Sequence, residues 1–244
     1  MILFLALLVA QAAAPVLTTP AAQLDACLAQ ARSDPAGAEQ AARMLGRAGE
    51  ACRGAALAGQ DDYAGAATAF TTAARNAEVA HETRAADYWA QAGNAWLAAG
   101  DAAKARAALD AALAAGTLTD LKRGEAYLDR ARALVATGDM KAARVDLDLA
   151  TRDAADDPLA WLLSATLARR MSDLPRAKLD IAQALRRSAD DASVQLEAGN
   201  IAAAAGEAER AQAAWKEAQR LAPDAPAGRS AANALTQFAG DTAK

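Results

Sequence analysis

Apolar and small residues recur along this chain with the spacing of one face of an α-helix. In residues 86–119 they fall at positions i, i+3, i+4 and i+7 over 89–96, and the stripe is repeated over 105–113. Gly100 and Asp101 separate the two halves. Glycine can end a helix in the left-handed conformation and aspartate can cap the next one, so the pattern predicts two amphipathic helices joined by a tight turn.

The order of residues in this stretch is also distinctive. It reads Trp, two residues, Ala-Gly, two residues and an aromatic residue, followed after the turn by Ala-x-x-x-Leu. This order resembles the tetratricopeptide (TPR) repeat, with Thr117 at the place of that repeat's terminal proline. The resemblance implies an all-α fold, a right-handed α-solenoid of stacked helix-turn-helix hairpins with a C-terminal capping helix.

Further copies of the pattern follow along the chain. Repeats beginning at Gly124, Pro158 and Ala192 give two successive spacings of 34 residues. We therefore predict a linker and N-terminal helical hairpin over 13–46, five TPR-like repeats over 47–225, and a capping helix with a frayed tail over 226–244. The predicted repeats are 47–80, 86–119, 124–157, 158–191 and 192–225.

The composition agrees with thin helix layers. The chain has 78 alanines and only 4% aromatic residues, which favours helices that approach closely over a thick globular interior. With 54% hydrophobic and 23% charged residues it is typical of a soluble helical protein rather than a disordered one. The net charge of −4 provides no basic excess to neutralise phosphates, so we expect no nucleic-acid partner.

The N-terminus has the features of an exported protein. No charged side chain occurs before Asp25, and the apolar segment 2–10 is followed by an A-x-A site at 10–12. This predicts a signal peptide over residues 1–12, cleaved near 12/13, and a location in the bacterial periplasm. Because no Lys or Arg precedes the apolar segment, an uncleaved inner-membrane anchor with the chain facing the periplasm is the alternative. Membrane contact is expected only in that case.

The two cysteines lie in the predicted N-terminal helices. If residues 36–58 formed one helix, Cys27 and Cys52 would be offset by roughly 16 Å along antiparallel helices, too far for a disulfide. A break at 46–49, which contains two glycines, would instead place the helices that carry the cysteines side by side. Pairing is favoured in an exported chain, so we predict a Cys27–Cys52 disulfide.

No residue pattern typical of catalysis is evident. His81 is the only histidine, the two cysteines are widely separated, and the glycines occur singly at expected helix ends. These features do not match a zinc site, a phosphate-binding loop or a nucleophile with its base. We predict a protein that is not an enzyme and uses no metal or small-molecule cofactor. The alternatives are an accessory subunit or an enzyme acting on cell-wall or polysaccharide material.

Stacked hairpins leave their first helices lining a concave groove that can bind a peptide or helix. Leu128 and Leu162 are large apolar residues off the predicted buried stripe, and either contact a partner or complete helix packing. Arginines beside them could orient an acidic or polar flank of a partner. The candidate groove residues are Asn94, Leu97, Leu128, Arg132, Leu162, Arg169 and Asn200.

One binding mode of TPR domains is not expected. Domains that clamp a partner's C-terminal carboxylate use a Lys and an Asn four residues apart on one first helix. Here Ala90 and Leu196 stand at the places paired with Asn94 and Asn200. The sequence therefore predicts a scaffold that binds a protein or peptide by other contacts, in envelope or secretion-related assembly.

Overall fold

The computed structural model describes the fold of residues 19–242, and the side chains of residues 19–238. That part of the chain is helical and contains no strand. The helices are α1 (Pro20–Gln30), α2 (Pro35–Leu45), the 3-10 helix η1 (Gly46–Gly49), α3 (Glu50–Ala58), α4 (Tyr63–Val79), α5 (Ala85–Ala98), α6 (Ala102–Ala114), α7 (Asp120–Ala136), α8 (Met140–Asp153), α9 (Pro158–Arg170), α10 (Leu174–Arg187), α11 (Ala192–Ala204), α12 (Ala208–Leu221) and α13 (Pro226–Thr242). The predicted signal peptide, residues 1–12, lies outside the described residues.

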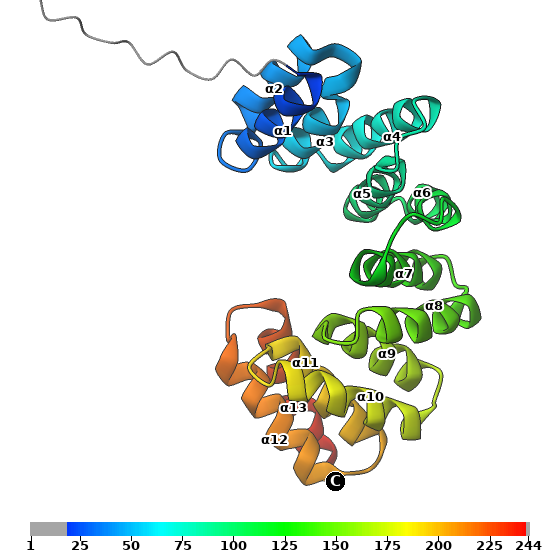
Figure 1. The fold of residues 1–244 in the computed structure, drawn as a ribbon. Coiled ribbons are helices and arrows are strands. Elements are labelled where there is room, and N and C mark those ends of the chain that lie inside the picture. The colour runs from blue at the N-terminus through cyan, green and yellow to red at the C-terminus, as the bar shows by residue number, and fades with distance from the viewer. Residues whose placement is uncertain (1–18, 243–244) are drawn as a thin grey trace, which may run out of the picture.

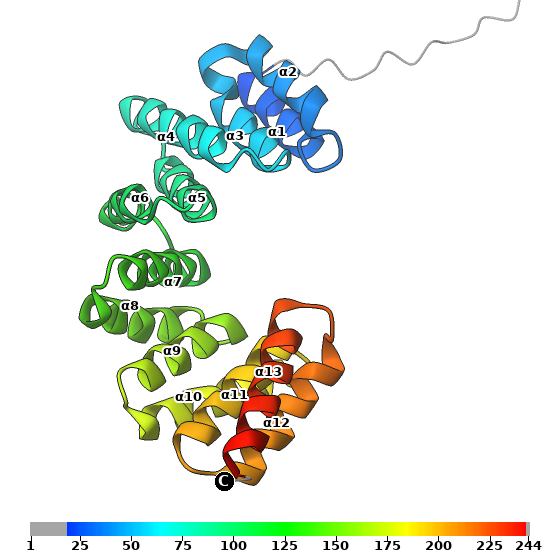
Figure 2. The ribbon, with the colours of Figure 1, turned by 180° about the vertical axis from the view of Figure 1, so that it is seen from behind.

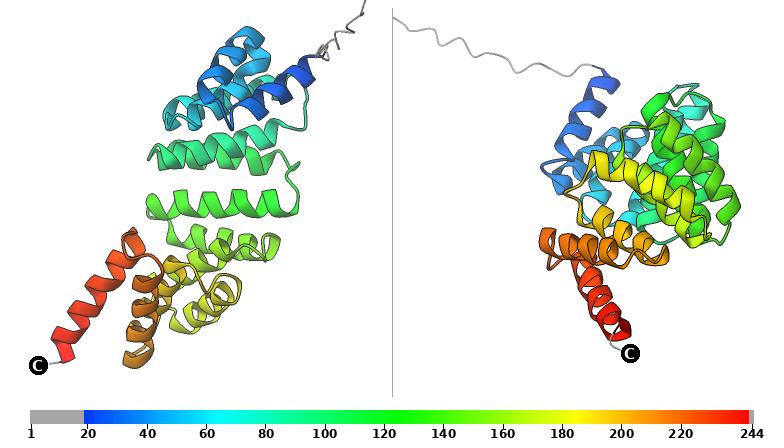
Figure 3. Two further views of the ribbon diagram at one scale, coloured as in Figure 1. Left: turned by 90° about the vertical axis from the view of Figure 1, so that its left-hand side faces the viewer. Right: turned by 90° about the horizontal axis from the view of Figure 1, so that it is seen from below.

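The helices form an α-solenoid. Each helix packs against its neighbours in sequence, and first helices of successive hairpins also meet, α5 with α7 and α9 with α11. Figures 1 and 2 show the stack following a curved path that is open on one side. In the left view of Figure 3, α5, α7 and α9 lie across the molecule as successive rows. The all-α solenoid predicted from the repeats is thus confirmed.

The turns inside the hairpins have the predicted glycine and aspartate chemistry. Gly100 has a φ of 81°, a conformation that glycine adopts without steric penalty. Asp101 caps α6, because its carboxylate accepts a hydrogen bond from the backbone amide of Lys104 at 3.0 Å. Gly138 and Asp139 make the same turn before α8. Each turn ends a first helix and fixes the start of the second.

Small residues let the paired helices approach closely. Gly199 on α11 faces the indole of Trp215 on α12, and a Cβ added to Gly199 would lie 2.4 Å from Trp215 Cδ1. Gly93 stands in the same relation to Leu109, with a Cβ position 2.4 Å from Leu109 Cγ. Both large side chains are buried. A large residue on one helix therefore packs directly on the backbone of its partner, which explains how an alanine-rich chain forms a close-packed core.

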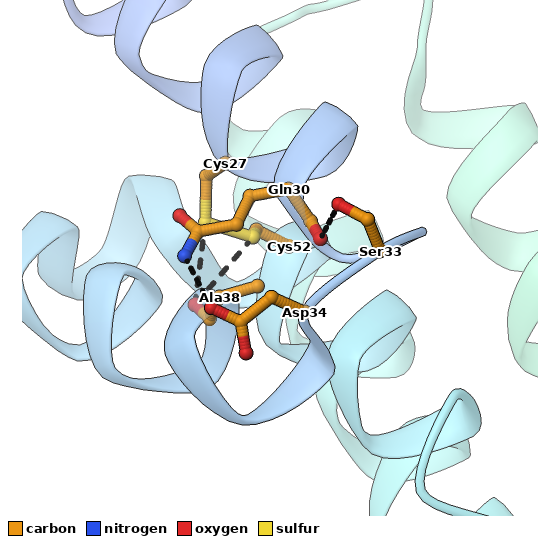
Figure 4. Close-up of a disulfide and its surroundings, with 6 residues drawn as sticks. All are labelled: Cys27, Gln30, Ser33, Asp34, Ala38 and Cys52. Carbon is orange, nitrogen blue, oxygen red and sulfur yellow. Dashed lines mark hydrogen bonds between the residues drawn. A yellow bond between two sulfur atoms is a disulfide. The ribbon is translucent and has the colours of Figure 1, made fainter.

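The N-terminal helices are joined by the predicted disulfide. Cys27 on α1 and Cys52 on α3 are bonded, with their Cα atoms 5.8 Å apart, and both are buried. Figure 4 shows their sulfur atoms facing the carbonyl oxygen of Ala38 on α2, at 3.4 and 3.8 Å. The α-helix is interrupted between α2 and α3 by η1, as the glycines predict. This break brings α1 into contact with α3.

The last helix covers the end of the stack. α13 packs against α11 and α12, and the ring of Phe238 meets the Trp215 ring edge to face with centroids 5.6 Å apart. The helix runs to Thr242, and residues 243–244 of the predicted frayed tail lie outside the described part. Between residues 19 and 242 no helix combines the length and hydropathy needed to cross a membrane.

Candidate peptide-binding groove

A broad hollow, here named the N-terminal cleft, is lined by residues of α1, α3, α4, α5 and α7 and has a volume of about 880 Å³. Lys122 Nζ lies 3.0 Å from both carboxylate oxygens of Asp87. Asp25 and Glu125 make no ion pair among the described residues, so the cleft has an excess of negative charge. Its charged lining residues are Asp25, Arg84, Asp87, Lys122, Glu125 and Asp129.

Two predicted groove residues lie at the edge of this cleft. Asn94 on α5 is exposed, and its Nδ2 donates a hydrogen bond to Oδ2 of Asp129 on α7 at 2.9 Å. Arg132 is also exposed, and its Nη1 lies 2.9 Å from Oδ1 of the same carboxylate. Asp129 therefore links α5 to the arginine one turn further along α7.

A smaller hollow lies beside Arg132, between the C-terminal halves of α7 and α9, with Leu147 of α8 contributing to its lining. It has a volume of about 160 Å³ and is named here the arginine-rimmed pocket. Arg132 and Arg170 stand at its rim and are both exposed. Most of the lining between them is apolar. The complete lining is Ala131, Arg132, Val135, Leu147, Leu163, Thr166, Leu167 and Arg170.

The position of Leu128 in the structure corrects its prediction as a groove residue. Its side chain is only 4% exposed and belongs to a buried cluster with Leu134 and Leu147. Ala160 on α9 contributes to the same cluster. Leu128 therefore takes part in the packing among α7, α8 and α9, which is the second of the two roles that the sequence left open, and it is not available to a partner.

The other two candidate leucines are half-buried. Leu162 packs against the cluster that contains Ile181, Val194 and Ile201, so part of its surface joins α9 to α11. Leu97 near the end of α5 is likewise partly accessible. Both remain candidates for contact with a partner through the surface that packing leaves open.

Arg169 and Asn200 are engaged in a polar network between helices. Arg169 Nε donates to Glu197 Oε1 at 2.6 Å, and Arg169 Nη2 donates to Glu197 Oε2 at 3.1 Å. Asn200 donates to Glu197 Oε2 at 3.2 Å and accepts from Trp215 Nε1 at 3.1 Å. The charge of Arg169 is therefore matched by a buried carboxylate, and its main contact is within the fold.

No protein-family model and no curated protein matches the sequence. Solved structures do resemble the fold. A chain from the crystal structure of the APC/C hetero-tetramer Cut9-Hcn1 superposes with a TM-score of 0.69 at 14% identity, covering 90% of this chain and 42% of that one. This chain therefore spans less than half of the length of that relative.

Two relatives match over nearly their whole length. PilW, described as a widely conserved type IV pilus biogenesis factor, has a TM-score of 0.71 at 17% identity, with 86% of this chain and 97% of PilW covered. YrrB, described as a TPR protein with an unusual peptide-binding site, has a TM-score of 0.57 at 18% identity and the same coverage. This chain has the fold of a TPR protein. At these identities the likeness concerns the fold alone.

The register of the TPR repeats explains why the contact between α7 and α9 differs from the contact between α9 and α11. Val135 and Arg169 occupy equivalent places 34 residues apart, as do Leu163 and Glu197. Between α9 and α11 this pair of places holds the Arg169–Glu197 ion pair. Between α7 and α9 it holds two aliphatic residues, which line the arginine-rimmed pocket. The apolar pattern of a single helix does not identify Val135, Leu163 and Glu197 as groove residues, whereas the 34-residue spacing of the repeats brings them into equivalent places.

Proposed function

We propose that this protein is a non-catalytic scaffold that binds a protein or peptide partner along the inner side of its TPR solenoid, in envelope or secretion-related assembly. The observation that carries the proposal is the pair of adjoining hollows on the first helices, one acidic and one apolar with an arginine rim. Exposed side chains of both charges beside an apolar pocket are suited to recognising a peptide. The descriptions of YrrB and PilW support a binding role and an assembly role respectively.

We also propose that the protein is exported to the periplasm, with its N-terminal segment cleaved near residue 12. The buried Cys27–Cys52 disulfide supports this location, since such bonds form and persist in oxidising compartments. Mass spectrometry of the mature protein tests the cleavage. A chain that begins at Met1 in the inner-membrane fraction would favour the anchored alternative, and a reduced protein in the cytoplasm would contradict both.

Site-specific photo-crosslinking in cells tests the binding surface. A photoreactive residue replaces Gln91 or Arg170 on the inner helices, both of which are exposed lining residues of the two hollows. Matched controls carry it at Val145 on α8 and Leu179 on α10, which are 59% and 68% exposed. We expect one protein, identified by mass spectrometry, to crosslink to the inner positions and not to the controls.

Three outcomes would contradict the proposal. Crosslinking confined to Val145 and Leu179 would move the binding surface to the second helices. Absence of any crosslinked protein from all four positions, in cells that need the protein, would remove the support for a scaffold. Turnover of cell-wall or polysaccharide material by the purified protein would contradict the non-catalytic assignment.

A further inference from the structure

The arginine-rimmed pocket has a size and lining suited to one aliphatic side chain. Its volume is about 160 Å³, which is small for a ligand site but sufficient for a side chain of leucine size. Leu147 and Leu167, which are 1% and 2% exposed, form a buried, apolar part of its wall. The Thr166 hydroxyl donates to the carbonyl of Leu162 at 2.8 Å and is therefore satisfied within α9. An apolar group can enter without leaving a buried polar atom unpaired.

The two rim arginines give the entrance a positive charge. The side chain of Arg170 makes no ion pair or hydrogen bond with any residue in the described part of the chain. Arg132 is paired only with Asp129, a partly exposed contact within one helix that contributes little. Guanidinium groups favour carboxylates because their donors match the two oxygens. The rim therefore complements an acidic group that lies beside the inserted side chain.

The charge of the inner surface changes from the N-terminal cleft to the pocket. Asp129 lines the N-terminal cleft and Arg132 lines the pocket, so the acidic and basic hollows adjoin on α7. Asp25 and Glu125 lie on the cleft side without an ion pair in the described residues. A partner that spans both hollows would meet negative charge beside α5 and positive charge beside α9.

We propose that the pocket takes a leucine-sized side chain from an internal segment of a partner protein, that acidic residues beside it on one side pair with Arg132 and Arg170, and that basic residues on its other side lie over the N-terminal cleft. This proposal rests on the proposed scaffold function and adds the chemistry and charge order of the partner segment. This internal segment differs from the C-terminus of a peptide, where the terminal carboxylate, and not acidic side chains, would pair with the two arginines.

Synthetic peptides provide the probe for the test. The parent peptide has the sequence Lys-Lys-Gly-Ser-Gly-Leu-Asp-Glu, with a blocked N-terminus, an amidated C-terminus and a fluorophore, and its binding is measured by anisotropy at low ionic strength. Replacing its Leu by Ala should weaken binding about tenfold, because the apolar contact is lost. Replacing Asp-Glu by Asn-Gln should weaken it about fivefold and remove most of the salt dependence. Placing Asp-Glu at the other end should also weaken it.

Variants of the protein locate the site. Arg170→Gln should weaken the parent peptide about fivefold but leave the Asn-Gln peptide unchanged. Arg186→Gln is a matched control, since Arg186 is likewise exposed in the last turn of a helix and makes no ion pair in the described part. Thr166→Phe should fill the pocket and abolish the preference for Leu over Ala. Circular dichroism checks that each variant keeps its helical fold.

The outcomes separate this proposal from the scaffold function. Equal binding of the Leu and Ala peptides, or an equal effect of Arg170→Gln and Arg186→Gln, would overturn the assignment of the pocket. Tighter binding of a peptide ending in a free C-terminal Leu would overturn the internal segment as its occupant. If no peptide binds while the inner positions still crosslink to a partner in cells, the pocket proposal fails and the scaffold function stands.

Discussion

Arg169 on α9 and Glu197 on α11 form a two-pronged ion pair that joins the first helices of successive hairpins, with the shorter contact, Nε to Oε1, at 2.6 Å. The Glu197 side chain is only 8% exposed, whereas that of Arg169 is 28% exposed. Removing the arginine would therefore leave a nearly buried carboxylate with Asn200 as its remaining partner.

We expect Arg169→Ala to lower the free energy of unfolding by about 2 kcal/mol, since a hydrogen-bonded charge would lose its main partner. Urea denaturation measures this change. Arg169→Leu combined with Glu197→Leu, which repeats the aliphatic chemistry of the equivalent Val135 and Leu163, should recover much of the loss. Equal stability of Arg169→Ala and the wild type would show that this contact has no structural role.

Leu128 should behave as a core residue. Leu128→Ala should cost about 3 kcal/mol of stability, because it removes buried methyl groups and leaves a cavity in the cluster formed by α7, α8 and α9. Leu179→Ala is the control, because Leu179 is 68% exposed on α10 and its removal should change stability by less than about 0.5 kcal/mol. Chemical denaturation of both variants is the measurement. If both substitutions change the stability by similarly small amounts, Leu128 would again be a candidate for contact with a partner.

Stability should depend on pH through Asp153. Hydrogen bonds from Arg152 and Arg123, at 2.8 and 2.6 Å, lower the pKa of Asp153 below the ordinary value of an aspartate. The unfolded chain takes up this proton at a higher pH than the folded chain, so the contribution is present at neutral pH and is lost as the pH falls through the folded pKa. The stability difference between wild type and Asp153→Asn should therefore be larger at pH 7 than at pH 3. A constant difference in urea titrations would contradict this.

The disulfide should stabilise the N-terminal end of the solenoid. It joins residues 25 apart in sequence, and loop-closure entropy predicts a contribution of about 3.5 kcal/mol. Reduction should increase amide hydrogen exchange in α1 and α2 first, because few other elements contact them. Exchange with and without reductant is the measurement. Unchanged exchange, or two free thiols in protein purified from the envelope, would contradict a stabilising bond.

The sequence predicted the features that depend on local spacing. Gly100 and Asp101 define a turn by their own conformational and hydrogen-bonding preferences, and the break before Cys52 follows from neighbouring glycines. The helix α7 begins at Asp120, four residues before the place where the sequence pattern puts the start of the third predicted repeat, Gly124. Gly124 lies inside the helix, where an added Cβ would stand 2.7 Å from Ala154 Cβ. The absence of a side chain at Gly124 therefore permits close packing against Ala154, and this glycine does not mark the start of the helix.

The groove could be predicted only in part. The sequence placed Asn94 and Arg132 on the inner side, where both are exposed. It could not decide the role of Leu128, because a leucine off the main stripe is buried or exposed according to how the next hairpin packs on it. The same limit applies to Arg169, whose partner lies on the following first helix. Contacts between repeats need the register of the whole stack, which one amphipathic helix does not supply.

Hydrogen–deuterium exchange of the protein with its crosslinked partner tests the inner binding surface most directly. The account predicts slower exchange on complex formation in α5, α7 and α9, centred on the turns of helix that carry Asn94, Arg132 and Arg170, with little change in α6, α8 and α10. Contacts made by side chains alone can leave amide exchange in a helix unchanged. Carboxyl footprinting detects such contacts, and we expect the carboxylates of Asp25 and Glu125 to become protected in the complex. Protection confined to α6, α8 and α10 would contradict the central claim that the first helices bind the partner.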